Sequence, residues 1–348
     1  MIGFPCVIRV INFTIYMENK RCLITGVAGL IGSHMAEHLV KKGYDVYGID
    51  NLSGGYIENV PQGVTFYCEE LGNKKALSRL FTKIKPDYVY HFAAYAAEGL
   101  SPFIRNFNYS NNLISSANII NECIKNDVKK IIFTSSMAVY GKGKPPFKET
   151  DIPHPIDPYG ISKYAVELDL ECAKSQFGLN YSIVRPHNVI GIRQNIWDKY
   201  RNVIGIWIRR VLRGESICIF GDGLQERAFS DIEFCLEPFE KLMFDFGGEV
   251  FNLGCPKQHT LNEIAELVRT IGLDFGFNLE IEHLPQRHGE AKYAYSDHSK
   301  AEKLLGFKDE TNFSKTVRDM FVWAMKQDDR EVKQMNYEIN KGMYNYWK

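Results

Sequence analysis

The chain has 348 residues, 45% of them hydrophobic and 24% charged, and Lys plus Arg balance Asp plus Glu at 42 each. This composition is typical of a globular protein without global attraction to nucleic acid or anionic membranes, and the length favours a large domain with a smaller one appended. The eight cysteines are scattered without metal-binding spacing, and no apolar run approaches the length of a bilayer span. We therefore expect a cytoplasmic protein with reduced thiols, no metal and no membrane partner.

Residues 1–16, MIGFPCVIRVINFTIY, are apolar enough to suggest a signal peptide. Arg9 and Asn12 interrupt this run, however, and no small-residue cleavage site follows. We predict a loosely attached N-terminal extension, with a short edge strand as the alternative.

From residue 20 the chain alternates short apolar runs with helix-like segments, which predicts a doubly wound parallel α/β sheet of the Rossmann type. The predicted NAD-binding domain spans 17–187, and part of 228–256 completes its sheet. A smaller C-terminal α/β domain for substrate spans mainly 188–348. The last residues, from about 326, are interpreted as a polar helix. The predicted strands lie within 20–26, 44–50, 64–70, 87–94, 129–136, 179–191 and 248–255.

Three glycines with GxxGxxG spacing, Gly26, Gly29 and Gly32, separate the first predicted strand from the first helix. Glycine lets the backbone approach a pyrophosphate there, and the helix N-terminus offers free N–H groups. Asp50 ends the next strand, where a carboxylate accepts hydrogen bonds from ribose hydroxyls and repels a 2′-phosphate. The pattern predicts a dinucleotide site that prefers NAD to NADP.

A second motif combines Ser136, at the end of a predicted strand, with Tyr159 and Lys163 in the first turns of a helix that begins at Pro158. Residues four apart share one helix face, so the lysine ammonium and the helix dipole should lower the pKa of the tyrosine. Tyr159 could then act as a general base, with Ser136 bound to the same substrate oxygen.

These motifs resemble the extended short-chain dehydrogenase/reductases, especially the nucleotide-sugar 4-epimerases and 4,6-dehydratases. The resemblance covers roughly residues 20–325. It is carried by TGVAGLIGSH, HFAA, SSMAVYG, PYGISK, RPHNVIG, GDGLQERAF and GEAKYAYSDHSKAEKLLGF, in that order.

The resemblance implies that Tyr159 takes the proton of a sugar 4-hydroxyl while hydride leaves C4 for tightly bound NAD. Lys163 would bind the nicotinamide ribose, and Ser136 would orient the sugar oxygen. The 4-keto sugar then turns over in the pocket, and hydride returns to its other face. The remaining NAD contacts implied are Leu30, Ile31, Asn51, Glu70, Leu71, Phe92, Ala93 and Ala94.

Met137 and Ala138 follow Ser136, where dehydratases of the family carry an acidic pair for C5 and C6 chemistry. Their absence favours simple 4-epimerisation. Glu98 lies in a segment that faces substrate in the family, so a dehydratase that uses Glu98 as acid/base is an alternative. Glu98 could equally be a partner of Arg105 or a helix end. A non-catalytic NAD-binding regulator is the third hypothesis.

A nucleotide-sugar substrate is further implied by residues that match the diphosphate and nucleoside contacts of the family. Guanidinium groups suit a diphosphate because they donate paired hydrogen bonds. Relatives commonly form homodimers through the helix that carries Tyr159 and the helix at about 112–126, and we expect the same here. The implied substrate contacts are Glu98, Ser136, Met137, Asn188, Asn202, Val203, Arg227 and Arg287.

Overall fold

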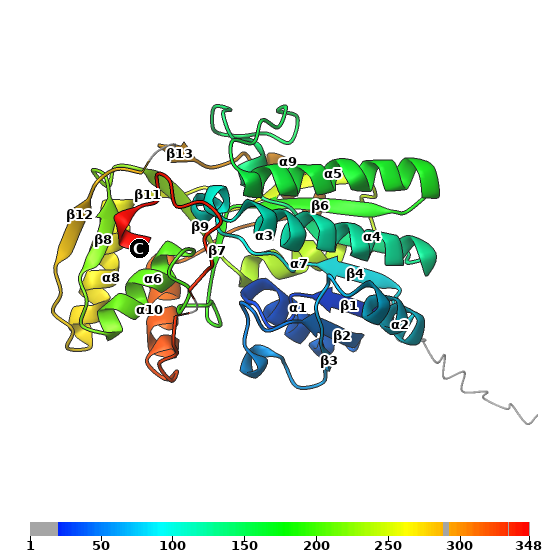
Figure 1. The fold of residues 1–348 in the computed structure, drawn as a ribbon, viewed down its shortest axis with the longest axis horizontal. Coiled ribbons are helices and arrows are strands. Elements are labelled where there is room, and N and C mark those ends of the chain that lie inside the picture. Colours follow the sequence, from blue (N-terminus) through cyan, green and yellow to red (C-terminus); the bar gives the residue numbers. More distant parts are fainter. Residues whose placement is uncertain (1–19, 288–291, 333, 348) are drawn as a thin grey trace, which may run out of the picture.

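The structure, a computed structural model, describes residues 20–287, 292–332 and 334–347, so the predicted extension 1–16 lies outside the described residues. Figure 1 shows two lobes, and the larger is built on a seven-stranded parallel sheet. The strand order is β10-β6-β5-β4-β1-β2-β3, which is a doubly wound sheet. The strands are β1 (Arg21–Thr25), β2 (Asp45–Asp50), β3 (Thr65–Cys68), β4 (Tyr88–His91), β5 (Lys130–Thr134), β6 (Tyr181–Pro186) and β10 (Glu249–Leu253).

Helices cover both faces of this sheet because its strands are apolar on both sides. In β1, Cys22 and Ile24 belong to one core and Leu23 to the other. The first core is closed by α1 (Leu30–Lys41), α7 (Glu233–Lys241) and α9 (Ser299–Leu305). The second is closed by α2 (Lys74–Ile84), α4 (Ser115–Lys125) and α5 (Pro158–Phe177).

The strand order reverses at β1, which pairs with β2 on one side and with β4 on the other. Connections leave the carboxyl ends of β1 and β4 in opposite directions, and ligands of open α/β sheets bind in the resulting crevice. β10 comes from the stretch 228–256 and pairs with β6, so the chain returns to the large sheet after entering the smaller lobe. The boundary between residues 187 and 188 stays a prediction.

The smaller lobe combines two short sheets with three helices around a separate apolar core. One sheet holds β7 (Asn188–Ile190), β9 (Glu226–Asp231), β11 (Gln258–Thr260) and β13 (Tyr293–Ala294); the other pairs β8 (Ile217–Phe220) with β12 (Ile281–Leu284). The helices are α6 (Val203–Leu212), α8 (Leu261–Asp274) and α10 (Phe313–Ala324).

The prediction of a polar helix after residue 326 is wrong. The described residues there form no α-helix, only the short 3-10 turn η5 (Asn345–Trp347). Aromatic side chains of this segment instead pack into an apolar cluster with η2 (Glu98–Phe103), and Trp347 is 1% exposed. The sequence did not predict this packing, because the aromatic residues are separated by polar ones and recur with neither a helical nor a strand period.

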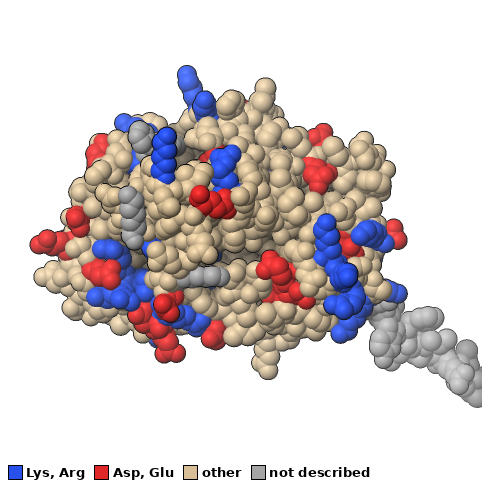
Figure 2. Space-filling view, in the orientation of Figure 1, with Lys and Arg blue, Asp and Glu red and all other residues tan. Residues whose placement is uncertain are grey.

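Within the described ranges, no helix is long and apolar enough to cross a bilayer. On the face shown in Figure 2, basic and acidic side chains occur in small separate groups of both signs. Among the residues with described positions, no group of three or more His, Cys, Asp or Glu side chains could hold a metal ion.

Candidate functional site

One cavity of about 840 Å³ opens at the carboxyl ends of the large sheet and continues into the smaller lobe. Every site residue predicted from the sequence lines it, although those residues come from segments more than 250 positions apart. The predicted residues on its wall are Gly26, Gly29, Leu30, Ile31, Gly32, Asp50, Asn51, Glu70, Leu71, Phe92, Ala93, Ala94, Glu98, Ser136, Met137, Tyr159, Lys163, Asn188, Asn202, Val203, Arg227 and Arg287.

The glycine loop has the tight geometry that a dinucleotide pyrophosphate requires. Gly26 adopts φ +73°, and a Cβ there would lie 2.8 Å from the backbone nitrogen of Ala93. A Cβ on Gly32 would lie 2.1 Å from the Gly26 carbonyl oxygen, so a larger residue would separate loop and helix. Gly29 caps α1, whose first turn carries no acidic side chain. These residues fit NAD.

Asp50 holds the same loop from the end of β2. Its carboxylate accepts hydrogen bonds from the backbone N–H of Ala28 at 3.0 Å and of Leu52 at 2.8 Å. Beside it, the Asn51 side chain donates to Glu70 at 2.7 Å. Carboxylates thus lie after the ends of two neighbouring strands on the cavity wall, and their contacts with the ribose and adenine of the cofactor stay a prediction.

Local capping fixes the start of α5 and therefore the position of Tyr159. The Asp157 side chain accepts a hydrogen bond from the Gly160 N–H at 2.9 Å, and Pro158 occupies the first turn. The backbone N–H of Tyr159 donates to Ser101 of η2 at 3.2 Å. The Asn108 side chain donates to the Pro158 carbonyl at 2.9 Å, so three segments hold the tyrosine backbone.

The expected lowering of the Tyr159 pKa is wrong for this structure. Burial raises the pKa of the Tyr159 phenol above its ordinary range, and the charge of Glu98 raises it further. A hydrogen bond with Ser136 and the charge of Arg201 act in the opposite direction but do not prevail. The prediction considered the helix spacing alone, whereas desolvation of a fully buried phenol dominates.

Lys163 shares the helix face of Tyr159, as predicted, and is itself desolvated. Its ammonium donates to the Thr134 carbonyl at 2.7 Å and lies 5.9 Å from the centroid of the Tyr159 ring. Burial lowers the pKa of Lys163 to about 7, although the charge of Glu167 opposes this shift. Lys163 therefore titrates closer to neutral pH than an exposed lysine does.

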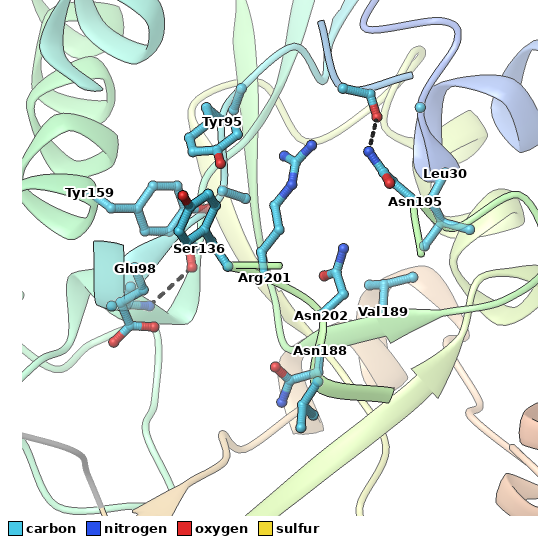
Figure 3. Close-up of a pocket in the computed structure, with 18 of the residues that line it drawn as sticks. Leu30, Tyr95, Glu98, Ser136, Tyr159, Asn188, Val189, Asn195, Arg201 and Asn202 are labelled. Atoms are coloured by element: carbon cyan, nitrogen blue, oxygen red, sulfur yellow. Dashed lines mark hydrogen bonds between the residues drawn. The ribbon is translucent and has the colours of Figure 1, made fainter. Parts of the chain in front are cut away.

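Ser136, Tyr159 and Glu98 face the cavity together at one end (Figure 3). Ser136 begins the short turn η4 (Met137–Val139), where its hydroxyl accepts a hydrogen bond from the Ala138 N–H at 3.1 Å. Met137 and Ala138 line the cavity at the positions where dehydratases of the family carry acids. Glu98, the first residue of η2, is the carboxylate that faces this end of the cavity.

The residues predicted to bind the nucleoside and diphosphate of the nucleotide sugar come from the smaller lobe. Asn202 adopts a left-handed conformation, φ 63°, immediately before α6, and Val203 begins the helix. The Asn188 side chain donates to the Ala228 carbonyl at 3.0 Å, beside Arg227 of β9. The Arg287 guanidinium lies over the Phe220 ring, 3.7 Å from the ring centroid.

Arg201 was not among the residues predicted to bind cofactor or substrate, yet its guanidinium occupies the middle of the cavity (Figure 3). It pairs with Asp198 at 2.9 Å and lies 4.6 Å from the Tyr95 ring centroid. Asn195, also missed, donates to the Gly54 carbonyl at 3.0 Å and so joins the two lobes. The sequence signal that could have indicated both residues is the concentration of polar side chains at 195–202. No known motif predicts the conformation of this segment.

A model of the NAD dependent epimerase/dehydratase family matches residues 22–254. The chain belongs to this family. The match confirms the predicted family, the α/β fold, the NAD cofactor and the assignment to enzymes of the epimerase class. NAD, when bound, supplies a positively charged nicotinamide ring that accepts and returns hydride.

Individual members of the epimerase/dehydratase family align with this chain over nearly their whole length. The putative UDP-glucose 4-epimerase of Methanocaldococcus jannaschii is 32% identical over 312 residues, 88% of this chain and 99% of that protein. A structure of the Thermotoga maritima UDP-glucose 4-epimerase with UDP-glucose aligns with a TM-score of 0.82 and 34% identity, covering 88% and 99% of the two chains. A structure of the UDP-N-acetylglucosamine 4-epimerase of Methanobrevibacter ruminantium M1, in complex with UDP-N-acetylmuramic acid, aligns with a TM-score of 0.80 and 32% identity. The alignment covers 89% of this chain and 99% of that one.

Proposed function

We propose that this protein is an NAD-dependent 4-epimerase of a UDP-sugar, either a hexose, an N-acetylhexosamine or a uronate. The observation that carries the proposal is that Ser136, Tyr159 and Lys163 line the same cavity as the glycine loop and the arginines of the smaller lobe. One cavity therefore offers a cofactor end, a proton-transfer centre and a cationic end suited to a diphosphate. The activities named for the relatives support this assignment.

In this proposal Tyr159 removes the proton of the sugar 4-hydroxyl while hydride leaves C4, and Ser136 holds the same oxygen. Because burial raises the pKa of Tyr159, proton removal requires positive charge close to the phenol in the loaded site. Lys163 would supply part of this charge, since it shares the helix face of Tyr159 and its ammonium lies 5.9 Å from the centroid of the Tyr159 ring. The 4-keto sugar turns over, and Tyr159 returns the proton when hydride returns to C4.

A 4,6- or 5,6-dehydratase is the second candidate, and one observation favours it. Glu98 lines the same end of the cavity as Ser136 and Tyr159 (Figure 3), so this carboxylate lies close to the expected position of the sugar. It could move a C5 proton that Met137 and Ala138 cannot. A non-catalytic NAD-binding regulator is a weaker hypothesis, since it would need no Ser136, Tyr159 and Lys163 in one cavity.

The test is proton NMR in D₂O of the protein with NAD and, in turn, UDP-glucose, UDP-N-acetylglucosamine and UDP-glucuronate. We expect one of these to form its 4-epimer without deuterium in the ring, because the same hydride leaves and returns. Deuterium at C5 or C6 with a 4-keto or unsaturated product would show the dehydratase chemistry and make Glu98 the residue to replace. Bound NAD without turnover of any nucleotide sugar would favour the regulator.

We also propose a homodimer formed through α4 and α5, which lie side by side in Figure 1. Apolar side chains remain exposed there, with Ile161 at 41% and Leu168 at 45% on α5, and Ile114 at 52% before α4. Ile161 and Leu168 are seven apart and share one face of the helix.

Leu168→Glu is therefore expected to convert a dimer into a monomer, because a charge would be buried at the centre of the interface. Light scattering coupled to gel filtration measures the mass. The matched control is Leu304→Glu, since Leu304 is 43% exposed on α9, a helix that closes the core on the opposite face of the sheet from α4 and α5. A wild-type monomer, or an unchanged Leu168→Glu dimer, would contradict the proposed interface.

A further inference from the structure

The segment 334–347, here called the strap, is the part of the structure whose role the family resemblance does not explain, because that resemblance ends near residue 325. In Figure 1 the strap is drawn in red and lies between η2 and the β8–β12 pair of the smaller lobe. Four of its residues, Lys341, Gly342, Tyr344 and Tyr346, line the catalytic cavity.

Both lobes hold the strap by hydrogen bonds. The Glu338 carboxylate accepts from the backbone N–H groups of Asn106 and Phe107, each at 2.8 Å, at the start of α3 (Arg105–Tyr109). On the other side, the Trp347 carbonyl accepts from Lys199 at 3.1 Å, and a bond within the strap joins the Tyr337 hydroxyl to the same carbonyl at 2.7 Å. The strap therefore has a defined path across the junction of the lobes.

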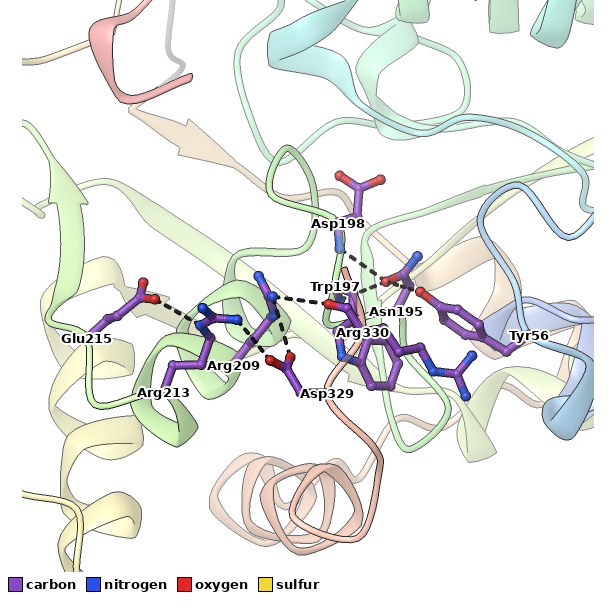
Figure 4. Close-up of polar contacts among 9 residues, drawn as sticks. All are labelled: Tyr56, Asn195, Trp197, Asp198, Arg209, Arg213, Glu215, Asp329 and Arg330. Carbon is purple, nitrogen blue, oxygen red and sulfur yellow. Dashed lines mark hydrogen bonds and ion pairs between the residues drawn. The ribbon is translucent and has the colours of Figure 1, made fainter. Parts of the chain in front are cut away.

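The chain that leads into the strap is anchored as well (Figure 4). Asp329 pairs at 2.9 Å with Arg213, which follows α6, and the Arg330 carbonyl accepts from Arg209 of α6 at 3.2 Å. The Arg330 guanidinium lies 4.0 Å from the Tyr56 ring centroid, in the large lobe. The strap and the residues before it therefore both contact the two lobes, and these contacts hold the strap in place.

At its far end the strap completes an aromatic box around Arg287. The guanidinium stacks on Phe220 of β8, and the strap adds Trp347 and Tyr344, whose ring centroids lie 5.4 and 5.9 Å from it. A Cβ built on Gly99 would lie 3.7 Å from the Trp347 ring and 4.0 Å from an Arg287 nitrogen. Arg287 is thus packed between the strap and η2, next to Glu98.

We infer that the strap is a specificity element that positions Arg287 for the diphosphate of a nucleotide-sugar substrate. Rings on several sides restrict the guanidinium to one orientation while leaving it on the cavity wall, and such pre-orientation lowers the entropy lost on binding an anion. Trp347 and Tyr344 act through Arg287 and are positioning residues. The inference rests on the proposed function, because it assumes a diphosphate at this end of the cavity.

The test compares UDP with UMP as probes, by calorimetric titration of the NAD-loaded protein. We expect wild type to prefer UDP, Arg287→Ala to lose most of that preference, and Trp347→Ala to reduce it about tenfold, which is the scale of one desolvated cation–π contact. UMP affinity should change less than twofold. In the double variant Arg287→Ala with Trp347→Ala, the second change should have no further effect on the preference.

Trp347→Phe, which keeps an apolar ring, should give an intermediate preference and guards against loss of folding in the alanine variant. The matched control is Trp323→Ala, because Trp323 packs on Trp197 with centroids 6.3 Å apart in the smaller lobe, away from the cavity wall. It should leave the UDP:UMP ratio unchanged.

Two results would overturn the strap inference alone: an unchanged UDP:UMP ratio in Trp347→Ala, or equal weakening of UDP and UMP, which indicates a merely structural role. Failure of wild type to bind UDP is a different result. It would remove the proposed nucleotide-sugar function and the strap inference with it.

Discussion

Replacing Tyr159 by Phe is expected to lower kcat at least about 100-fold while NAD stays bound, because the variant loses the proton acceptor and keeps the ring that packs in the cavity. The phenol is buried, and its backbone is fixed by Ser101 and Asn108. Turnover of the active UDP-sugar and the NAD released on denaturation measure the two properties separately.

Tyr90→Phe is the matched control for this prediction. Tyr90 is fully buried in β4, its hydroxyl donates to the Phe239 carbonyl at 3.2 Å, and it lies outside the cavity wall. We expect its kcat to stay within about twofold of wild type, since only a structural hydrogen bond is lost. Near wild-type turnover in Tyr159→Phe would show that another group removes the proton.

Lys163→Met is expected to lower turnover by a similar factor and to stabilise the NAD-free protein by about 2 kcal/mol at pH 7. Burial lowers the pKa of the Lys163 ammonium from 10.5 to about 7. Between these pH values the unfolded chain binds more protons than the folded one, so the free energy of unfolding of wild type rises with pH. The free-energy cost of burying the charge therefore has its full value below pH 7 and falls to zero near pH 10.5. At that pH Lys163→Met should no longer be more stable than wild type.

Lys130→Met provides the comparison, because Lys130 is 2% exposed and its ammonium also donates to a carbonyl, that of Asp245. Burial lowers the pKa of Lys130 to about 8, but the side chain does not line the cavity. Thermal unfolding measured from pH 6 to pH 10 should show a smaller gain in stability for Lys130→Met than for Lys163→Met. Turnover of Lys130→Met should be unchanged. A Lys163→Met variant less stable than wild type at pH 7 would contradict the cost assigned to the buried charge.

Lys163 illustrates how a residue of the candidate site can cost stability. The charge of Glu167, one turn away on α5, does not offset the desolvation of the Lys163 ammonium, so the pKa of Lys163 falls to about 7. Glu167 is itself bound to Arg185 in a buried ion pair behind the cavity. An apolar side chain at 163 is therefore expected to favour folding, at the expense of the proposed role of Lys163 in proton transfer.

The sequence by itself determined the elements whose cause is local. The glycine loop, Asp50 and the spacing of Tyr159 and Lys163 depend on a backbone turn, a strand end and a helix period, which are short-range properties. The seven strands of the large sheet were recognisable because each is a short apolar run between helices, and the structure pairs them in the doubly wound order.

Only the tertiary structure decided the features that depend on burial and on distant segments. The pKa of Tyr159 rises because many segments together exclude water from the phenol, and the helix spacing carries no information about desolvation. Arg201 reaches the centre of the cavity from an irregular loop, and the strap packs its aromatics without any period. Hydrophobic periodicity reports a face of a regular element, so it cannot reveal contacts made by irregular segments.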